Sequence, residues 1–327
     1  MSTPAPVVVN EPAGGPGGRP SDGLPRSGPL DAAFGAPEWD LVTAIASIWG
    51  SSFVLIAIGL GTFTPAVVAF ARLALGLLTI LAFPGARRRL PRADTHRAHL
   101  AGVVWMGAPL LLFPIAQQWV ASSVAGMING AMPLFATLVW VVVMRRSPGR
   151  VQLVGIVVGF VGIVAVALPS ARGADASPLG VALLLIAVLL YGIATNLIAP
   201  LQRRHGALPV VVRAQAAGVV VLLPFALFGL DDSSWSWSSA LAMIPLGVLG
   251  SGVAFLAMTT LVGRAGADRG SIAIYFVPIV AIVLGVILRG ESVHVLQLAG
   301  TALVIVGAWL TSRKRPTAPQ GVTSAAP

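Results

Sequence analysis

PLFATLVWVVVMRR, Pro133 to Arg146, is an apolar run that opens on a proline and ends on two arginines. A similar order returns in PIVAIVLGVILRGE, Pro278 to Glu291. An apolar run closed by two arginines, as in the first stretch, is typical of a helix that crosses a membrane and keeps its charged end in the cytoplasm. Proline removes a backbone hydrogen bond, so each helix should kink or break there. We interpret Pro133 and Pro278 as hinges, with an ordinary packing kink as the alternative.

The composition is that of a membrane protein. Hydrophobic residues make up 56% of the 327 residues and charged residues only 10%, against about 25% charged in soluble domains. The net charge of +10 comes from arginines in short clusters between apolar segments, without a basic domain carrying interleaved aromatic residues. We therefore expect the lipid bilayer as a partner and no nucleic acid. The chain has no cysteine, which excludes disulfides and thiolate ligands.

Ten apolar segments are long enough to cross a membrane. A helix that rises 1.5 Å per residue needs about 20 apolar residues to cross a hydrocarbon core about 30 Å thick. The sequence therefore predicts an all-α polytopic membrane protein with ten transmembrane helices. The predicted spans are residues 41–60, 63–83, 100–120, 123–144, 151–168, 179–199, 207–229, 239–261, 270–288 and 293–311.

The basic residues are distributed unevenly between the two sides of these helices. Lysine and arginine stay preferentially on the cytoplasmic side of a membrane. If the N-terminus is cytoplasmic, 17 of the 21 basic residues lie on that side, and the opposite loops keep only Arg172 and Arg289. We predict a multi-pass protein of the plasma (inner) membrane with both termini in the cytoplasm. The 17 residues are Arg19, Arg26, Arg87, Arg88, Arg89, Arg92, Arg97, Arg145, Arg146, Arg150, Arg203, Arg204, Arg264, Arg269, Arg313, Lys314 and Arg315.

Both ends of the chain lack long apolar segments. Residues 1–39 are rich in proline and glycine, and the chain ends in the similar stretch TAPQGVTSAAP. Such sequences bury too little apolar surface to fold. We predict disordered cytoplasmic tails at residues 1–39 and 313–327.

The chain contains an internal repeat. A displacement of 145 residues aligns Pro133 with Pro278, Gly155 with Gly300 and Gly162 with Gly307, and a displacement of 142 aligns Gly50 with Gly192. Each half holds five predicted spans, an odd number, so the second half must enter the membrane from the opposite side. Two inverted five-helix repeats of this kind underlie many secondary transporters.

Four motifs in this order carry a resemblance to a known family. They are WGSSF at Trp49 to Phe53, FAR ending at Arg72, AQQWVASSVAG before Pro133, and GADRGSIAIYFVP ending at Pro278. The sequence resembles the drug/metabolite transporter superfamily, in its ten-helix branch with two EamA-like domains. The resemblance implies a first EamA-like repeat at residues 40–169 and a second at residues 170–312. One departure is Arg145-Arg146 in the first half, where the second half has the Gly290-Glu291 pair that is frequent in the family.

Several aromatic and polar residues lie inside the predicted spans, away from the interface where such aromatic residues usually lie. Small-molecule sites are mostly apolar pockets with a few placed polar groups, so these residues could line one. For each residue alone, ordinary packing is the alternative. The candidate substrate-binding residues are Trp49, Ser52, Arg72, Trp105, Gln117, Asn129, Tyr191, Thr195, Asn196 and Tyr275.

Of these residues, Arg72 has the highest free-energy cost of insertion into the membrane. It lies about 14 to 16 Å from either end of its span, too far to reach water by extending its side chain. An arginine at that depth must face a wet cavity or find a partner, and the spans hold no deep carboxylate. Two explanations stay open: Arg72 donates to backbone carbonyls freed at a helix break, or it binds a negative group on the substrate. Arg213 lies only about 9 Å from the cytoplasmic end of its span and should reach water.

The polar residues do not favour an enzyme. All Asp, Glu and His residues lie at span ends, in loops or in the tails, so no catalytic or metal-binding group is expected within the membrane. No phosphate-binding GxxxxGK[ST] motif is present, and we expect no cofactor. The glycines of the fifth span, Gly155, Gly159 and Gly162, and the segment Val248 to Ala254 are interpreted as internal packing surfaces.

Together these patterns predict a secondary active or facilitative transporter that works by alternating access. The family resemblance implies a small organic substrate, such as an amino acid, a related metabolite or a drug, usually moved outward. A lipid or lipid-linked-sugar flippase is one alternative, and a membrane scaffold or receptor without transport is another. The substrate, the coupling ion and the oligomeric state stay open, and a monomer is compatible with the sequence.

Overall fold

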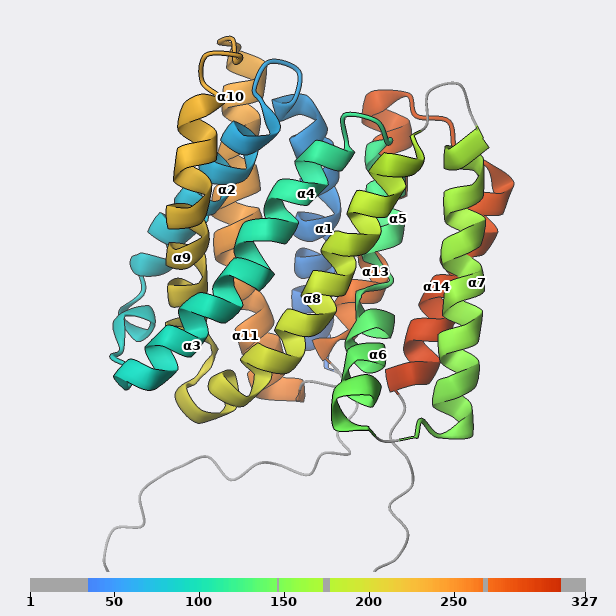
Figure 1. Ribbon diagram of the computed structural model, residues 1–327, viewed down its shortest axis with the longest axis horizontal. Coiled ribbons are helices and arrows are strands. Elements are labelled where there is room, and N and C mark those ends of the chain that lie inside the picture. Colours follow the sequence, from blue (N-terminus) through green and yellow to red (C-terminus); the bar gives the residue numbers. More distant parts are fainter. Residues whose placement is uncertain (1–34, 146, 173–176, 267–269, 313–327) are drawn as a thin grey trace, which may run out of the picture. The chain divides into compact units, whose positions relative to one another are not determined.

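The computed structural model describes residues 35–145, 147–172, 177–266 and 270–312, and all regular elements among them are helices (Figure 1). The tail predicted at 313–327 and residues 1–34 of the other predicted tail lie outside the described residues. Helix α1 begins at Ala36, before residue 40, where we expected the first repeat to start. The sequence favours this earlier start because Pro37 suits the first turn of a helix and Glu38 accepts a hydrogen bond from the Gly35 N–H at 3.0 Å.

Nine helical segments in the described part of the chain are long and apolar enough to cross a membrane, and α2 is a shorter apolar helix of 17 residues. The first half of the chain contains α1 (Ala36–Gly59), α2 (Pro65–Leu81), the 3-10 turn η1 (Pro84–Arg87), α3 (Arg92–Gly102), η2 (Val103–Gly107), α4 (Ala108–Ala116), α5 (Ser122–Asn129), α6 (Met132–Met144) and α7 (Arg150–Arg172). The second contains α8 (Pro178–His205), α9 (Ala207–Phe228), α10 (Trp237–Ile244), η3 (Pro245–Val253), α11 (Ala254–Ala265), α13 (Ile272–Arg289) and α14 (Val295–Ser312).

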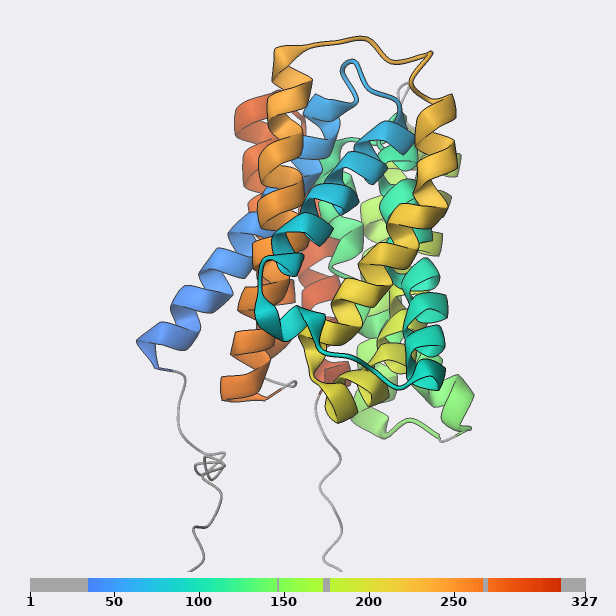
Figure 2. The same ribbon diagram turned by 90° about the vertical axis from the view of Figure 1, so that its left-hand side faces the viewer.

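The chain reverses direction at alternate ends of the helical bundle (Figures 1 and 2). The α2–α3, α6–α7 and α8–α9 connections lie at the lower end in Figure 1, and the α1–α2, α4–α5, α9–α10 and α13–α14 connections lie at the upper end. We call these the arginine-rich end and the arginine-poor end. The arginine side chains that the structure describes in the connections lie at the arginine-rich end. Arg289, the last residue of α13, is the exception among them.

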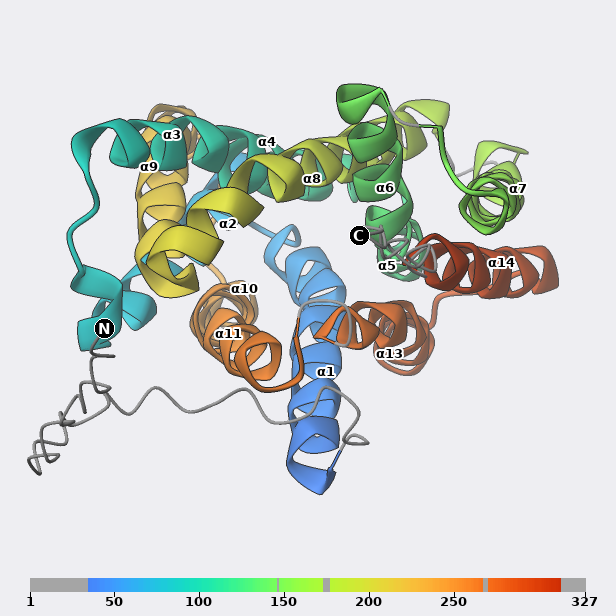
Figure 3. The same cartoon turned by 90° about the horizontal axis from the view of Figure 1, so that it is seen from below.

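Helices α7 and α14 pack through glycine at one side of the bundle (Figure 3). A Cβ placed on Gly155 would lie 2.8 Å from the Gly307 carbonyl oxygen, and one on Gly162 would lie 2.6 Å from the Gly300 carbonyl oxygen. The two helices are therefore antiparallel and touch backbone to backbone. This confirms the prediction that the glycines of this span serve internal packing.

The same kind of contact recurs in the two halves of the chain. Gly50 of α1 faces Val280 of α13, and a Cβ there would lie 2.5 Å from the Val280 Cβ. Gly192 of α8 faces Phe135 of α6, and a Cβ there would lie 2.7 Å from the Phe135 carbonyl carbon. The displacements found in the sequence relate Gly50 to Gly192 and Phe135 to Val280, so the two contacts are equivalent.

The two prolines have different places in their helices. The chain breaks at Gly130 and Ala131, and Pro133 then occupies the first turn of α6, where a missing N–H costs nothing. Pro278 lies inside α13, which continues through it, so of the expected kink or break the helix does not break here. Its ring packs against Gly130, where an added Cβ would lie 2.6 Å from the Pro278 Cγ. Both prolines therefore act at one place, the break between α5 and α6.

Glu291 fixes the start of α5 at the arginine-poor end. Its Oε1 accepts hydrogen bonds from the Ser122 N–H at 2.9 Å and the Ser122 hydroxyl at 2.6 Å, and its Oε2 accepts one from the Ser123 N–H at 2.8 Å. Burial opposes ionisation of this carboxyl, but these hydrogen bonds outweigh burial and hold the pKa of Glu291 below its ordinary value. The carboxylate is thus committed to the helix N-terminus. Arg146, which replaces this glutamate in the first half, lies outside the described residues.

Candidate functional site

Arg72 is held near the middle of α2 by a residue of the opposite half. Its Nε donates to the Ser251 hydroxyl of η3 at 3.0 Å. Among the described residues, its terminal nitrogens Nη1 and Nη2 have no hydrogen-bond partner, and the two ion pairs that the structure forms both involve Asp94 instead. The side chain is only half-buried. Ser251 therefore orients the guanidinium and leaves its outer edge free.

The segment η3 is a π-helix that supplies acceptors to three other helices. The Gly250 carbonyl accepts from Trp49 Nε1 of α1 at 3.0 Å, and the Ser251 carbonyl accepts from the fully buried Gln215 of α9. π-helices close their hydrogen bonds over one residue more than α-helices and occur often at functional sites. The segment Val248 to Ala254 also packs closely, as predicted, because a Cβ at Gly252 would lie 2.6 Å from the Thr79 Cγ2. The acceptor role of this segment is an addition that the sequence did not indicate.

A second π-helix, η2, lies at the equivalent place of the first half. The displacement of 145 residues relates Gly107, the last residue of η2, to Gly252 in η3. Trp105 of η2 and Trp49 of α1 both contact the ring of Phe255 edge-on, with ring centroids 5.6 and 5.7 Å away. The structure thus gathers two of the predicted tryptophans around a phenylalanine that the sequence did not single out.

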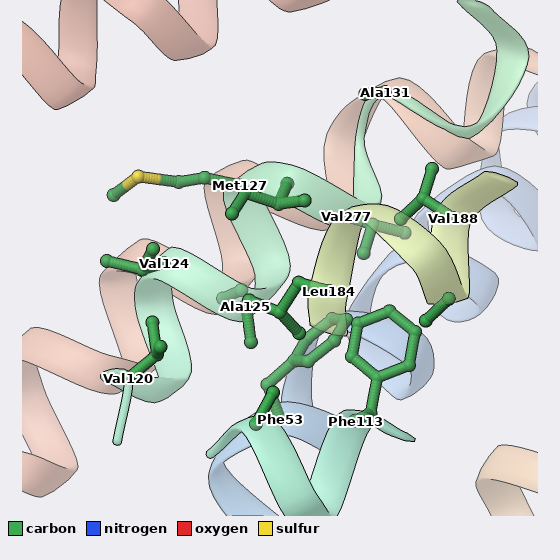
Figure 4. Close-up of a cluster of buried hydrophobic side chains, with 14 of the residues drawn as sticks. Phe53, Phe113, Val120, Val124, Ala125, Met127, Ala131, Leu184, Val188 and Val277 are labelled. Atoms are coloured by element: carbon green, nitrogen blue, oxygen red, sulfur yellow. The ribbon is translucent and has the colours of Figure 1, made fainter. Parts of the chain in front are cut away.

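Tyr191 of α8 completes the aromatic part of the site. Its ring stacks on Phe113 of α4 at 5.9 Å with an angle of 28° between the planes, and Phe113 in turn contacts Phe53 of α1 at 5.7 Å (Figure 4). Tyr191 also lies within electrostatic range of Arg72. Arg72 and Tyr191 thus share one region with Ser251, and the Trp49 indole binds the residue next to that serine.

Thr195 and Asn196, one turn beyond Tyr191, use their donors for packing. The Thr195 hydroxyl donates to the Tyr191 carbonyl at 2.8 Å. The Asn196 amide donates to the carbonyls of Gly192 at 2.9 Å and Ala136 at 3.0 Å, which fastens α8 to α6. These contacts match the packing alternative that we left open for both residues.

The remaining candidates have separate environments. Ser52 is buried beside Gly250 and donates to the Ile48 carbonyl at 3.0 Å. Asn129 is half-buried at the break before α6. Gln117 lies at the arginine-poor end of α4, away from Arg72. The prediction for Tyr275 needs correction, because its hydroxyl bonds Ser312 of α14 at 2.6 Å and its ring is buried in the α13–α14 contact.

Arg213, the other arginine within a span, has its own partners. It donates to the carbonyls of Pro209 and Arg88, each at 2.8 Å, at the arginine-rich end. Arg213 was predicted to reach water, and the structure instead places it half-buried on these two carbonyls. Arg72 and Arg213 therefore differ in one respect that bears on function: only the Arg72 guanidinium keeps unpaired terminal nitrogens.

The arrangement suits an organic anion. A guanidinium presents parallel donors that match a carboxylate, and aromatic rings around it can hold the apolar body of a small molecule. No three His, Asp or Glu side chains of the described residues come together as metal ligands. The site therefore offers binding groups, and among the described residues it offers no metal-binding group.

Comparisons with known proteins identify a family and several relatives of this chain. The profile of the "EamA-like transporter family" matches residues 38–168 and 178–313. An "uncharacterized transporter" of Archaeoglobus fulgidus is 23% identical, with 85% of this chain and 99% of that protein covered. A "probable terminal-alkyne amino-acid exporter" of Streptantibioticus cattleyicolor is 28% identical, with 84% and 93% covered. The "uncharacterized inner membrane transporter YedA" of Escherichia coli is 27% identical, with 86% and 95% covered.

The fold is also similar to that of a solved protein. One crystal structure superimposes with a TM-score of 0.59 at 16% identity, and the match covers 84% of this chain and 95% of that one. At this identity the likeness concerns the fold alone. The helices of this chain are therefore arranged as in a known structure over most of their length.

Proposed function

This chain belongs to the EamA-like transporter family, a family of multi-pass membrane proteins, and from that premise we propose that it exports a small organic metabolite that carries a carboxylate. Amino acids and closely related compounds are the class that fits. Transport proceeds by alternating access around the site formed by Arg72, Ser251, Trp49 and Tyr191. The relative named as a probable amino-acid exporter supports the choice of substrate class.

One observation carries the proposal: Arg72 stands in the middle of the bundle with its Nε held by Ser251 and its terminal nitrogens unpaired among the described residues. An arginine at this depth costs about 2.5 to 3.5 kcal/mol on insertion scales. Such a cost is offset when the guanidinium binds an anion during each transport cycle. Of our two initial explanations, binding of the substrate gains support, because the backbone carbonyls at the π-helix are bonded by Trp49 and Gln215 instead.

The proposed mechanism uses the two halves as inverted repeats. The antiparallel α7–α14 contact and the equivalent contacts of Gly50 and Gly192 are what a twofold relation between the halves produces. The break between α5 and α6, with Pro278 packed against it, would serve as the hinge. Both termini would lie in the cytoplasm, because the arginines gather at the end of the bundle where α6 and α8 end.

The transport proposal is tested with purified protein in liposomes. Vesicles loaded with an unlabelled amino acid should take up the same radiolabelled amino acid by exchange, with a saturable rate, for at least one member of the standard set. The matching amino-acid amide, which has no carboxylate, should exchange at the rate of protein-free vesicles. If all carboxylates and amides tested exchange only at that background rate, the reading as a scaffold or receptor replaces this one.

The orientation is tested by cysteine labelling, because the chain has no cysteine of its own. Asp232 and Arg88 are both exposed and lie at opposite ends of the bundle. An impermeant thiol reagent added to intact cells should label Asp232→Cys and leave Arg88→Cys unlabelled until the membrane is opened. Labelling of Arg88→Cys in intact cells would reverse the orientation.

A flippase is the second candidate, and one observation favours it. A pocket of about 380 Å3 lies between α1, η3 and α13 at mid-depth, and its lining is apolar apart from Ser47 and Ser51. Such a pocket suits an acyl chain better than an amino acid. Liposomes that contain a fluorescent phospholipid decide the question: bleaching from outside should reach the inner leaflet only if the protein moves lipid. We expect no protein-dependent bleaching of that leaflet.

A further inference from the structure

A separate pocket lies at the arginine-poor end of the bundle, where α1, α4 and α13 end and α10 begins. It has a volume of about 600 Å3, enough for an amino-acid-sized molecule. Ala57, Ile58 and Leu60 form an apolar wall, and Arg289 supplies the only charge in its lining. The pocket is distinct from the Arg72 site, whose residues do not line it.

Two polar side chains of this pocket, Gln117 and Thr62, have atoms without a hydrogen-bond partner among the described residues. Five buried side-chain atoms among the described residues make no hydrogen bond, and three of them lie here: both carboxamide atoms of Gln117 and the hydroxyl oxygen of Thr62. Leaving a buried polar atom unpaired costs about 1 to 3 kcal/mol. A ligand that enters the pocket could supply these atoms with the hydrogen-bond partners that they lack, because both residues line it.

Arg289 is available to that ligand. The nearby carboxylate of Glu291 is committed to Ser122 and Ser123, and no ion pair or hydrogen bond of Arg289 is found within the described part of the chain. An arginine is also uncommon at this end, where Arg289 and Arg172 are the only basic residues that the sequence predicts in loops. A bound anion in this pocket would account for the positive charge of Arg289 at this end.

We infer that this pocket is a second binding site, for a small carboxylate with an apolar body. Arg289 binds the carboxylate, Gln117 and Thr62 form hydrogen bonds with the polar groups beside it, and Ile58 and Leu60 contact the apolar part. Binding here needs neither Arg72 nor transport, so the inference stands apart from the proposed function. In an exporter oriented as we propose, this is where a substrate would be held before release.

The test uses the natural absence of cysteine. Ser238 lines the pocket and is exposed, so Ser238→Cys in the full chain should react with N-ethylmaleimide. N-acetyl-leucine is the probe, because it has a carboxylate and an apolar side chain, and N-acetyl-leucinamide is its uncharged match. In purified protein, millimolar N-acetyl-leucine should slow the labelling several-fold and the amide should not. Gln118→Cys, on the same lining, serves as a second reporter.

Three controls assign the protection to the pocket. Arg289→Gln should raise the concentration of N-acetyl-leucine needed for protection roughly tenfold or more, since it removes a charged hydrogen-bond donor. Arg72→Gln should leave protection unchanged, and Asp232→Cys, which lies at the same end but outside the lining, should not be protected. Equal protection by the amide, unchanged protection in Arg289→Gln, or no protection at either reporter would overturn the inference.

Discussion

Replacement of Arg72 by glutamine should lower the exchange of carboxylate substrates by roughly 10- to 100-fold, the effect of one charged hydrogen bond worth about 1.5 to 3 kcal/mol. Glutamine keeps a donor that can reach Ser251 but loses the charge and the fork of the guanidinium. Arg72→Lys should lower the exchange rate by a similar factor, because a single ammonium cannot bind a carboxylate with two parallel hydrogen bonds. Exchange in liposomes at equal protein content is the measurement, and both variants should reach the membrane at near-normal levels.

Arg213→Gln is the matched control for this experiment. It removes the same side chain from another span, but one whose guanidinium is already bonded to the carbonyls of Pro209 and Arg88. We expect its exchange rate to stay within about twofold of the wild type, because Arg213 and the two carbonyls that it contacts lie outside the Arg72 site. If Arg213→Gln loses as much as Arg72→Gln, or if Arg72→Gln does not fold, Arg72 is a structural residue and leaves the site.

The second large effect concerns the contact between α7 and α14. Leucine at Gly162 should prevent recovery of monodisperse protein, because its Cβ alone would lie 2.6 Å from the Gly300 carbonyl oxygen and 2.7 Å from the Val304 nitrogen. Overpacking against movable side chains costs about 1 to 3 kcal/mol. Here the obstacle is backbone, so the two helices must separate. Size-exclusion chromatography after extraction is the measurement.

Gly263→Leu is the control for that substitution. Gly263 lies in helix α11, and a Cβ there has no neighbour within 4 Å. The same leucine should therefore give a profile like that of the wild type. Gly300→Leu should fail as Gly162→Leu does, since a Cβ at Gly300 meets the Gly162 carbonyl oxygen at 2.7 Å. A monodisperse Gly162→Leu protein would show that α7 and α14 are not held as the structure describes.

Much of the helical arrangement could be predicted, because its signals are local. Apolar length marks the spans, and the repeated glycines of α7 and α14 survive as a periodic pattern at the shared displacement. The second span was predicted as residues 63–83, but α2 covers only Pro65–Leu81, because apolar residues continue into the turns on both sides. Hydropathy alone does not indicate the residue at which a helix ends.

The site was harder to predict, because depth in a span does not reveal which way a side chain faces. Tyr191 and Tyr275 are both aromatic at mid-span, yet the first stacks on Phe113 and the second is buried against α14. Ser251 and Phe255 carry no signal of their own, being a small and an apolar residue in an apolar run. Gln215 did carry a sequence signal, since an amide nine residues into a span needs a hydrogen-bond partner.

The two π-helices could not be predicted from the sequence either, because α and π turns use the same apolar residues. Their presence has a mechanical consequence for η3. A π turn holds one extra residue, so rewinding it as an α-helix would rotate everything beyond it by about 100° and advance it by about 1.5 Å. Such a rotation would carry the Phe255 ring away from Trp49 and Trp105 and draw the Ser251 hydroxyl off Arg72. A change of winding within one helix would thus dismantle both the aromatic and the charged half of the site in a single step.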